Sequence, residues 1–154
     1  MTVLLAAILF LAPHVGHDQA KIYGAVIQRE AARYGIDPLL VVAVIDRETG
    51  GSWNPKARSR TNDFGLMQVH VSVTTYSGYL RRPERLFNPK VNIRLGVRLL
   101  GMWQQYHRSN CPKDSHPWWS HYQHGVKVTD RGASGKRVGR VYSLLLRQLR
   151  RPGT

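Results

Sequence analysis

The chain has 154 residues, a length that fits one domain with a substantial hydrophobic core. Its 23 Lys and Arg and 9 Asp and Glu give a formal net charge of +14, which favours an anionic partner. Nucleic acid, anionic lipid and a cell wall that carries carboxylates and phosphates all fit this charge, so charge alone does not choose among them. The single cysteine, Cys111, excludes a disulfide within these residues and predicts no metal cluster.

The amino end carries an apolar run from Val3 to Ala12. The run has the length of the apolar part of a signal peptide and is too short for a comfortable bilayer span. We therefore expect residues 1–19 to be an export segment. Two features are atypical of a signal, because no basic side chain precedes the run and Asp18 interrupts the small-residue pattern that ends at Ala20. A retained amino-terminal anchor and a buried first helix are the alternatives.

The remaining residues, 20–150, predict a single domain with a basic carboxyl-terminal tail, because no linker or internal repeat divides them. Residues 20–34 predict a helix that ends at Gly35 and packs against the next helix. Its core-facing side chains are expected to be Ile22, Val26, Ile27, Ala31 and Tyr34.

Residues 38–49 predict a second helix, which is almost wholly apolar. Asp37 can cap it, Pro38 suits the first turn, and the glycine pair that follows Thr49 supplies a left-handed stop. At about 100° per residue, Glu48 falls on the apolar face, whereas Asp46 projects roughly 160° away from it. Asp46 therefore cannot share the site of Glu48.

Glu48 is the first candidate functional residue. A carboxyl group among apolar side chains loses hydration mainly in its charged form, so its pKa should rise towards the range of a general acid. The alternative is that Glu48 simply ends the helix in solvent, as many surface glutamates do. The helix alone does not decide between these two interpretations.

Residues 52–70 lack helical periodicity and predict short extended segments, with a small hairpin as one form, along one wall of a cleft. Residues 71–87 predict irregular structure with helical turns around 73–80. Asn88 caps a helix predicted to run from Pro89 to about Tyr106. Its expected apolar face is Val91, Ile93, Leu95, Leu99, Leu100, Met102, Trp103 and Tyr106, and its expected solvated face is Lys90, Arg94, Arg98, Gln105 and Arg108.

Residues 109–116 predict a polar loop and residues 118–124 a short helix that ends at Gly125. Residues 126–137 predict a basic loop, and residues 138–149 a last helix that packs through Val141, Tyr142, Leu145 and Leu149. His121 and His124 have a spacing that could hold a metal, but neither a second pair nor a nearby acid joins them in the sequence. We therefore predict no metal site. The aromatic group around Trp118 and Trp119 fits either a core role or a surface on which a sugar ring stacks.

An ordered set of short motifs gives a more specific indication. Glu48 follows an apolar helix and is itself followed by Gly50, Asn54-Pro55, Ser59 and the run Gly65-Leu66-Met67-Gln68. The set continues with Asn88-Pro89, Asn92-Ile93, Gly96, Tyr122, Gly125 and Tyr142. In this order the residues resemble the SLT family, the soluble lytic transglycosylases of peptidoglycan within the lysozyme-like superfamily, over about residues 22–145.

The chain departs from that family at two places. It has Glu48-Thr49 where the family often has Glu-Ser, and both residue types carry a hydroxyl group. It has Tyr122-Gln123-His124-Gly125 where the family often has Tyr-Asn-Ala-Gly.

The resemblance implies a mainly α, lysozyme-like α+β fold, with helices around a central catalytic helix and a small hairpin beside a glycan cleft. It implies Glu48 as the catalytic acid and base, with Ser59, Gln68, Tyr122 and Gln123 as substrate-binding residues. The backbone of Gly65, Leu66 and Met67 would lie close to the glycan. The implied reaction cleaves peptidoglycan with a 1,6-anhydromuramyl product and needs neither a metal nor an organic cofactor. Most glycosidases use two carboxylates, and Asp63 is the only second acid nearby in the sequence, where it could equally be a turn former.

Three further predictions concern rivals and setting. A muramidase that hydrolyses the same bond is the nearest rival, and a basic nucleic-acid-binding module or a cationic protein that disrupts lipid are rivals from other classes. The resemblance implies an exported, periplasmic or wall-associated protein whose partner is the glycan strand. It also suggests specialised enzymes that serve a secretion, pilus, conjugation or phage assembly.

Overall fold

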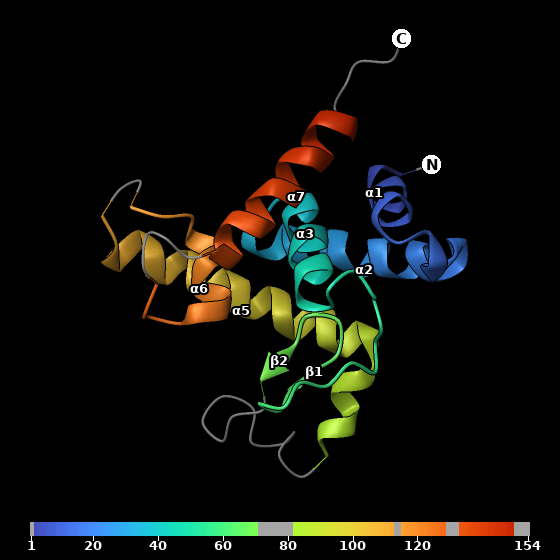
Figure 1. The fold of residues 1–154 in the computed structure, drawn as a ribbon, viewed down its shortest axis with the longest axis horizontal. Helices are drawn as coiled ribbons and strands as arrows, with labels where there is room; N and C mark the ends of the chain where they lie inside the picture. The colour runs from blue at the N-terminus through green and yellow to red at the C-terminus, as the bar shows by residue number, and fades with distance from the viewer. Residues whose placement is uncertain (1, 71–81, 113–114, 129–132, 150–154) are drawn as a thin grey trace.

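The computed structural model describes residues 2–70, 82–112, 115–128 and 133–149 (Figure 1). Helices dominate this part of the chain, together with one small antiparallel sheet, so the expected mainly α fold is confirmed. The elements are α1 (Val3–Leu11), η1 (Pro13–Val15), α2 (His17–Tyr34), α3 (Pro38–Glu48), β1 (Asp63–Phe64), β2 (Val69–His70), η2 (Pro83–Phe87), α5 (Pro89–Asn110), η3 (Trp118–Ser120), α6 (His121–His124) and α7 (Ala133–Leu149).

Helix α3 lies at the centre of the molecule and is packed by α1, α2 and α7 (Figure 1). Asp37 caps it by accepting a hydrogen bond from the Leu39 amide at 2.9 Å, and every residue from 39 to 45 is buried. The helix ends at Glu48, where Gly50 and Gly51 adopt positive φ angles of 59° and 79°. The predicted helix is therefore confirmed, and its last residue carries the candidate acid to the edge of the core.

Helix α2 begins at His17, three residues earlier than predicted, and packs on both α3 and α5. Its core contacts at Val26, Ile27 and Ala31 are confirmed. The expected burial of Ile22 and Tyr34 is wrong, because these side chains are 42% and 38% exposed. Tyr23 takes the inward position beside Ile22. The Tyr34 ring instead covers Gly101 of α5, where an added Cβ would lie 2.5 Å from the ring.

The apolar run at the amino end forms helix α1, which packs against α2, α3 and α7. Leu4, Leu5, Ala7 and Ile8 are all at most 5% exposed and belong to the core. This is the arrangement of a buried first helix, and the export role of the segment stays a prediction. Among the described residues, no helix is both long and apolar enough to cross a bilayer.

The predicted hairpin is formed by β1 and β2, with Asp63 opposite His70 and Phe64 opposite Val69. The buried side chain of Asn92 on α5 fixes the turn between these strands. Its Oδ1 accepts from the Met67 amide at 2.8 Å, and its Nδ2 donates to the carbonyls of Phe64 (2.6 Å) and Leu86 (2.9 Å). The hairpin is thus tied to a long helix rather than held by its own few strand contacts.

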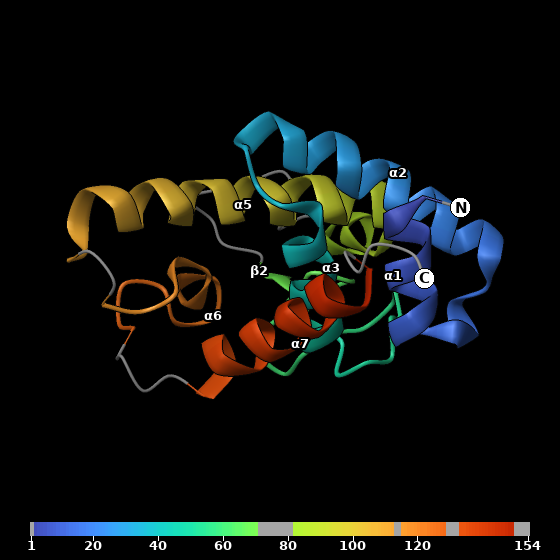
Figure 2. The same ribbon diagram turned by 90° about the horizontal axis from the view of Figure 1, so that it is seen from above.

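Helix α5 runs along one side of the molecule beneath α2 (Figure 2). It continues to Asn110, four residues beyond the predicted end. Its basic face is confirmed, because Lys90, Arg94, Arg98, Gln105 and Arg108 are all exposed. The placement of Met102 on the apolar face is wrong, because this side chain is 50% exposed.

Helix α7 packs on the remaining side of α3, whereas η3 and α6 pack mainly on α5. Helix α7 begins at Ala133, so the second half of the predicted loop 126–137 is wrong, and the helical turns expected around 73–80 lie outside the described residues. The Tyr142 hydroxyl donates to Oδ2 of Asp37 at 2.8 Å, and the Trp119 indole donates to the Gly135 carbonyl at 3.1 Å. Trp119 therefore joins η3 to α7.

Candidate active site

The carboxyl group of Glu48 faces a cavity of about 370 Å³ between α3, the hairpin and α6. Five of the predicted site residues line this cavity together, although they come from three separate segments. The complete lining is Arg47, Glu48, Ser59, Asp63, Gln68, Tyr122, Gln123 and His124. The acid at the end of α3 is thus surrounded by residues from the hairpin region and from α6.

Burial raises the pKa of the Glu48 carboxyl above its usual range. A hydrogen bond from Gln123 and the positive charge of Arg47 oppose this rise, whereas the negative charge of Asp63 adds to it. Loss of hydration is the largest of these effects, as expected for a carboxyl group at the edge of an apolar helix. A proton is therefore held on Glu48 at a higher pH than on a carboxyl group in water.

The short helix α6 supplies the wall opposite the hairpin. The side-chain amide of Gln123 donates a hydrogen bond to Oε1 of Glu48. The adjacent Tyr122 hydroxyl donates to the Met67 carbonyl at 2.7 Å, so α6 is also joined to the turn between β1 and β2. Two consecutive residues therefore hold the acid and the hairpin in one arrangement.

Ser59 and Asp63 form a hydrogen-bonded group on the hairpin side of the cavity. The Ser59 hydroxyl donates to Oδ2 of Asp63 at 2.6 Å, and the Thr61 hydroxyl reaches the same oxygen at 2.6 Å. The other carboxylate oxygen lies 3.0 Å from Nδ1 of His70. The sequence left Asp63 open as a second acid or a turn former, and the fold brings it to the Glu48 cavity with both of its oxygens engaged.

Gln68 lies on the cavity with a positive φ of 45°, a strained value for a residue with a side chain. Its amide donates to the Gly65 carbonyl at 2.8 Å, which fixes the turn. Gly65 itself has a φ of 73°, and an added Cβ would lie 2.4 Å from Nδ2 of Asn92. Leu66 and Met67 are buried as whole residues, and Gly65, Leu66 and Met67 are absent from the lining of the Glu48 cavity, so the predicted contact of their backbone with the glycan stays a prediction.

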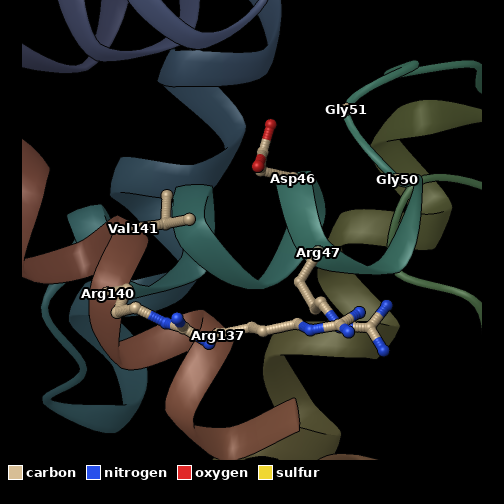
Figure 3. Close-up of a pocket in the computed structure, with 7 residues that line it drawn as sticks. All are labelled: Asp46, Arg47, Gly50, Gly51, Arg137, Arg140 and Val141. Carbon is tan, nitrogen blue, oxygen red and sulfur yellow. The ribbon is translucent and has the colours of Figure 1, made fainter. Parts of the chain in front are cut away.

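A second cavity, of about 360 Å³, lies against α3 on the side of Asp46 and Arg47. Figure 3 shows that the arginine side chains of α3 and α7 run alongside one another there, while Asp46 points away from them. We call Arg47, Arg137 and Arg140 the arginine pocket. Among the described residues, Nε of Arg47 is a buried side-chain nitrogen without a hydrogen-bond partner. Arg47 lines both cavities, so the arginine pocket adjoins the Glu48 cavity.

The premise that nothing joins His121 in a possible metal group also needs correction. The structure gathers His107, Cys111 and His116 around it, with the ligand atoms of all four within 4.8 Å of one another. His124, which the sequence paired with His121, lies instead on the Glu48 cavity. In the sequence these four residues are separated by four, five and five positions. This pattern does not indicate a metal site by itself, because the residues lie on the end of α5, on a loop and on the short helix α6.

Comparison with known proteins is consistent with this geometry. Residues 25–118 match the family described as Transglycosylase SLT domain. The chain is also similar to proteins named "Membrane-bound lytic murein transglycosylase C" in Yersinia pestis (strain Pestoides F) and Yersinia pseudotuberculosis serotype O:1b (strain IP 31758). In each case the identity is 36% over 101 residues, which is 61% of this chain and 28% of the relative. The chain thus spans little more than a quarter of the relatives' length. Because the family match runs from α2 to the start of η3 and covers more than half of the chain, this protein belongs to the transglycosylase SLT domain family.

Proposed function

We propose that this protein is a peptidoglycan lytic transglycosylase in which Glu48 acts first as the acid and then as the base. The observation that carries this proposal is the carboxyl group of Glu48, which lies at the end of a buried helix, faces a cavity and has a raised pKa. A general acid needs this combination of access and retained proton. The family to which the chain belongs supports the same reaction.

In the proposed reaction, Glu48 donates its proton to the glycosidic oxygen between N-acetylmuramic acid and N-acetylglucosamine. The bond from that oxygen to the muramyl anomeric carbon breaks, and the acetamido group of the muramyl residue stabilises the cationic carbon. The ionised Glu48 then takes the proton of the muramyl 6-hydroxyl, whose oxygen bonds to the anomeric carbon. The products are a new glycan end and a 1,6-anhydromuramyl ring, with Glu48 protonated again and no water consumed.

The remaining cavity residues would orient the acid and the sugar. Gln123 holds one oxygen of Glu48, which leaves the other oxygen available for the glycosidic bond. Tyr122 fixes the Met67 carbonyl, and Gln68 shapes the turn at Gly65. From the family resemblance we propose that the turn from Gly65 to Met67 comes close to the glycan, with Gln68 of the same turn facing the cavity.

A hydrolytic muramidase remains the second candidate, and Asp63 is the observation that favours it. A second carboxylate on the same cavity could in principle activate water. Asp63, however, already accepts from two hydroxyl groups and lies beside His70, which suits a structural role in the hairpin. We therefore assign the reaction to Glu48 alone.

The proposed substrate also sets the proposed location. Peptidoglycan lies outside the cytoplasmic membrane, and the named relatives are described as membrane-bound, so we propose an envelope location with export as the route. Service to a secretion, pilus or phage assembly is a further proposal that rests on the resemblance of residues 62–70 to specialised enzymes. The exposed basic side chains would attract the anionic wall polymer without reading a nucleic-acid sequence.

Digestion of purified peptidoglycan tests the proposal directly. The soluble products of the wild type should carry 1,6-anhydromuramyl ends, which mass spectrometry separates from reducing ends because they are lighter by one water. The Glu48→Gln variant should release neither kind of product. Reducing ends from the wild type would instead identify a muramidase, and release of fragments by Glu48→Gln would refute the assignment of the acid.

A further inference from the structure

The last turns of α5 lie beside η3 and α6 (Figure 2). Three histidines and the cysteine converge there. Nε2 of His121 lies 3.3 Å from Nδ1 of His107, 3.4 Å from Sγ of Cys111 and 3.1 Å from Nε2 of His116. We call these four residues the His-Cys cluster. His121 is 1% exposed, and the other three are half-buried.

The imidazole ring of His121 directs the lone pair of its Nε2 atom towards the other three residues. Its Nδ1 lies 2.6 Å from the Gly125 carbonyl oxygen, and a carbonyl can only accept, so the proton of the neutral ring is on Nδ1. Nε2 then has no proton to donate, yet three potential ligand atoms lie around it. A backbone carbonyl that fixes the tautomer in this way is the usual support of a metal-bound histidine.

The other members of the cluster are also suited to bind a cation. Nδ1 of His116 lies 3.1 Å from the Ser115 hydroxyl, so its Nε2 is the atom turned to the cluster. The rings of Trp103 and Tyr106 lie 5.6 and 5.3 Å from His121 and limit access of water to that side.

We propose that His107, Cys111, His116 and His121 bind one zinc ion as a structural site. Imidazole nitrogen and thiolate sulfur are both ligand types of zinc, and in a tetrahedral site neighbouring ligand atoms of these kinds stand roughly 3.3–3.6 Å apart. The distances from His121 to His107 and Cys111 match this spacing, and the distance to His116, 3.1 Å, is slightly shorter. The widest pair in the cluster, within 4.8 Å, needs a contraction of about 1 Å. On binding, the Cys111 thiol releases its proton to solvent and its sulfur bonds to the metal.

The position of the cluster gives the zinc ion a definite task. His121 is the first residue of α6, and the next two residues contact the hairpin and Glu48. A metal that joins His121 to the end of α5 would therefore fix the wall that orients the acid. This inference does not depend on the reaction that the site performs, since the ligands lie outside the Glu48 cavity.

Metal analysis of untagged protein, kept reduced, tests the proposal. We expect one zinc per chain by elemental mass spectrometry, and a Co²⁺ titration should give the near-ultraviolet band of thiolate bound to Co²⁺. Cys111→Ser should remove that band, and both Cys111→Ser and His116→Ala should weaken zinc binding more than about 100-fold, beyond the 10–100-fold cost of losing a mere supporting partner. His17→Ala, which removes an exposed histidine elsewhere, should bind like the wild type.

The same measurements can overturn the proposal. Failure of the wild type to bind zinc or Co²⁺ would show that the cluster is only a hydrogen-bonded group of rings. Equal zinc affinity in His116→Ala, Cys111→Ser and the wild type would place any bound metal elsewhere. Circular dichroism of each variant checks that it is folded, and the Co²⁺ spectrum of the wild type decides the thiolate ligand even if a variant does not fold.

Discussion

The side-chain amide of Gln123 donates a hydrogen bond to the Glu48 carboxylate, across 75 residues of sequence. The bond favours the charged form of the acid, whereas burial favours the neutral form and has the larger effect on the pKa. Glu48 is thus held between two opposing influences that come from different elements. The following expectations depend on this balance and on the packing around it.

Glu48→Gln should lower wall-lytic activity by at least about 10²- to 10⁴-fold, because the amide cannot donate the acidic proton. Turbidity loss of a peptidoglycan suspension measures the effect. Asp46→Asn is the matched control, since that carboxyl lies on the opposite side of α3 and accepts from the Trp53 indole at 3.2 Å. A loss of similar size in the control would mean that damage to α3, rather than loss of the acid, explains the first result.

The same substitution should stabilise the folded protein near neutral pH. The folded-state pKa of Glu48 is raised above its unfolded value, so ionisation of this group opposes folding once the pH exceeds the unfolded pKa. Glu48→Gln removes that cost and should raise Tm by a few degrees at pH 7, with the difference shrinking below about pH 4.3. Thermal scans at both pH values measure this, and an unchanged or lower Tm at pH 7 would argue against the raised pKa.

Gln123→Ala should move the alkaline limb of kcat/KM to higher pH. The Gln123 amide lowers the pKa of Glu48, so its removal allows the acid to keep its proton at a higher pH. The maximal rate should fall as well, because the carboxyl group loses its orientation. Gln123→Asn should show a smaller change in the same direction. A limb that shifts to lower pH in both variants would contradict the role given to Gln123.

Asn92→Ala should destabilise the protein by about 3 kcal/mol or more, because three buried backbone groups lose their partner. Urea denaturation measures the free energy of unfolding. The control is Asn110→Ala, whose exposed amide donates to the Tyr106 carbonyl at 2.9 Å and should cost less than about 0.5 kcal/mol. Equal losses in the two variants would show that the hairpin does not depend on Asn92.

Ile8→Ala should cost about 2–4 kcal/mol if α1 remains in the mature protein, since Ile8 is fully buried in the core. Phe10→Ala on the same helix should be close to neutral, because Phe10 is 50% exposed. Mass spectrometry of the exported protein shows whether residues 1–19 are still present. A mature chain that lacks them and is stable would restrict α1 to the precursor.

The arginine pocket should contribute to recognition of anionic groups on the wall polymer. Arg137→Ala combined with Arg140→Ala should weaken binding to peptidoglycan by about three- to tenfold, the size expected for exposed charges. Arg94→Ala with Arg98→Ala makes the same change in net charge on the exposed face of α5. Co-sedimentation measures both, and equal weakening would indicate a general charge effect instead of a pocket.

The sequence predicts those helices and turns whose ends are determined by residues within or next to them. Asp37, Pro38 and the glycine pair mark the ends of α3, and the apolar period places Glu48 on the buried face. The hairpin and the short helix before Gly125 were predicted for similar reasons. Each of these depends on residues that are close together in the sequence.

Long-range placement was not predictable in the same way. The arrival of Asp63 at the Glu48 cavity depends on how the hairpin docks on α5, and the His-Cys cluster combines a helix end with two later segments. The apolar run of α1 fits an export segment and a core helix equally well, because both require the same residue types. The start of α7 was missed because its first turn contains glycine and polar residues.

Asp37 serves two helices at once, since one carboxylate oxygen caps α3 and the other accepts from Tyr142 of α7. The acid-bearing helix is therefore clamped at its start and enclosed along its length, while the carboxyl group at its far end faces the hairpin and α6, which are short segments. Evolutionary change in this domain should accumulate in those short segments, which can be remodelled without disturbing the helix. Chemistry would then stay constant while the shape of the glycan that is accepted varies.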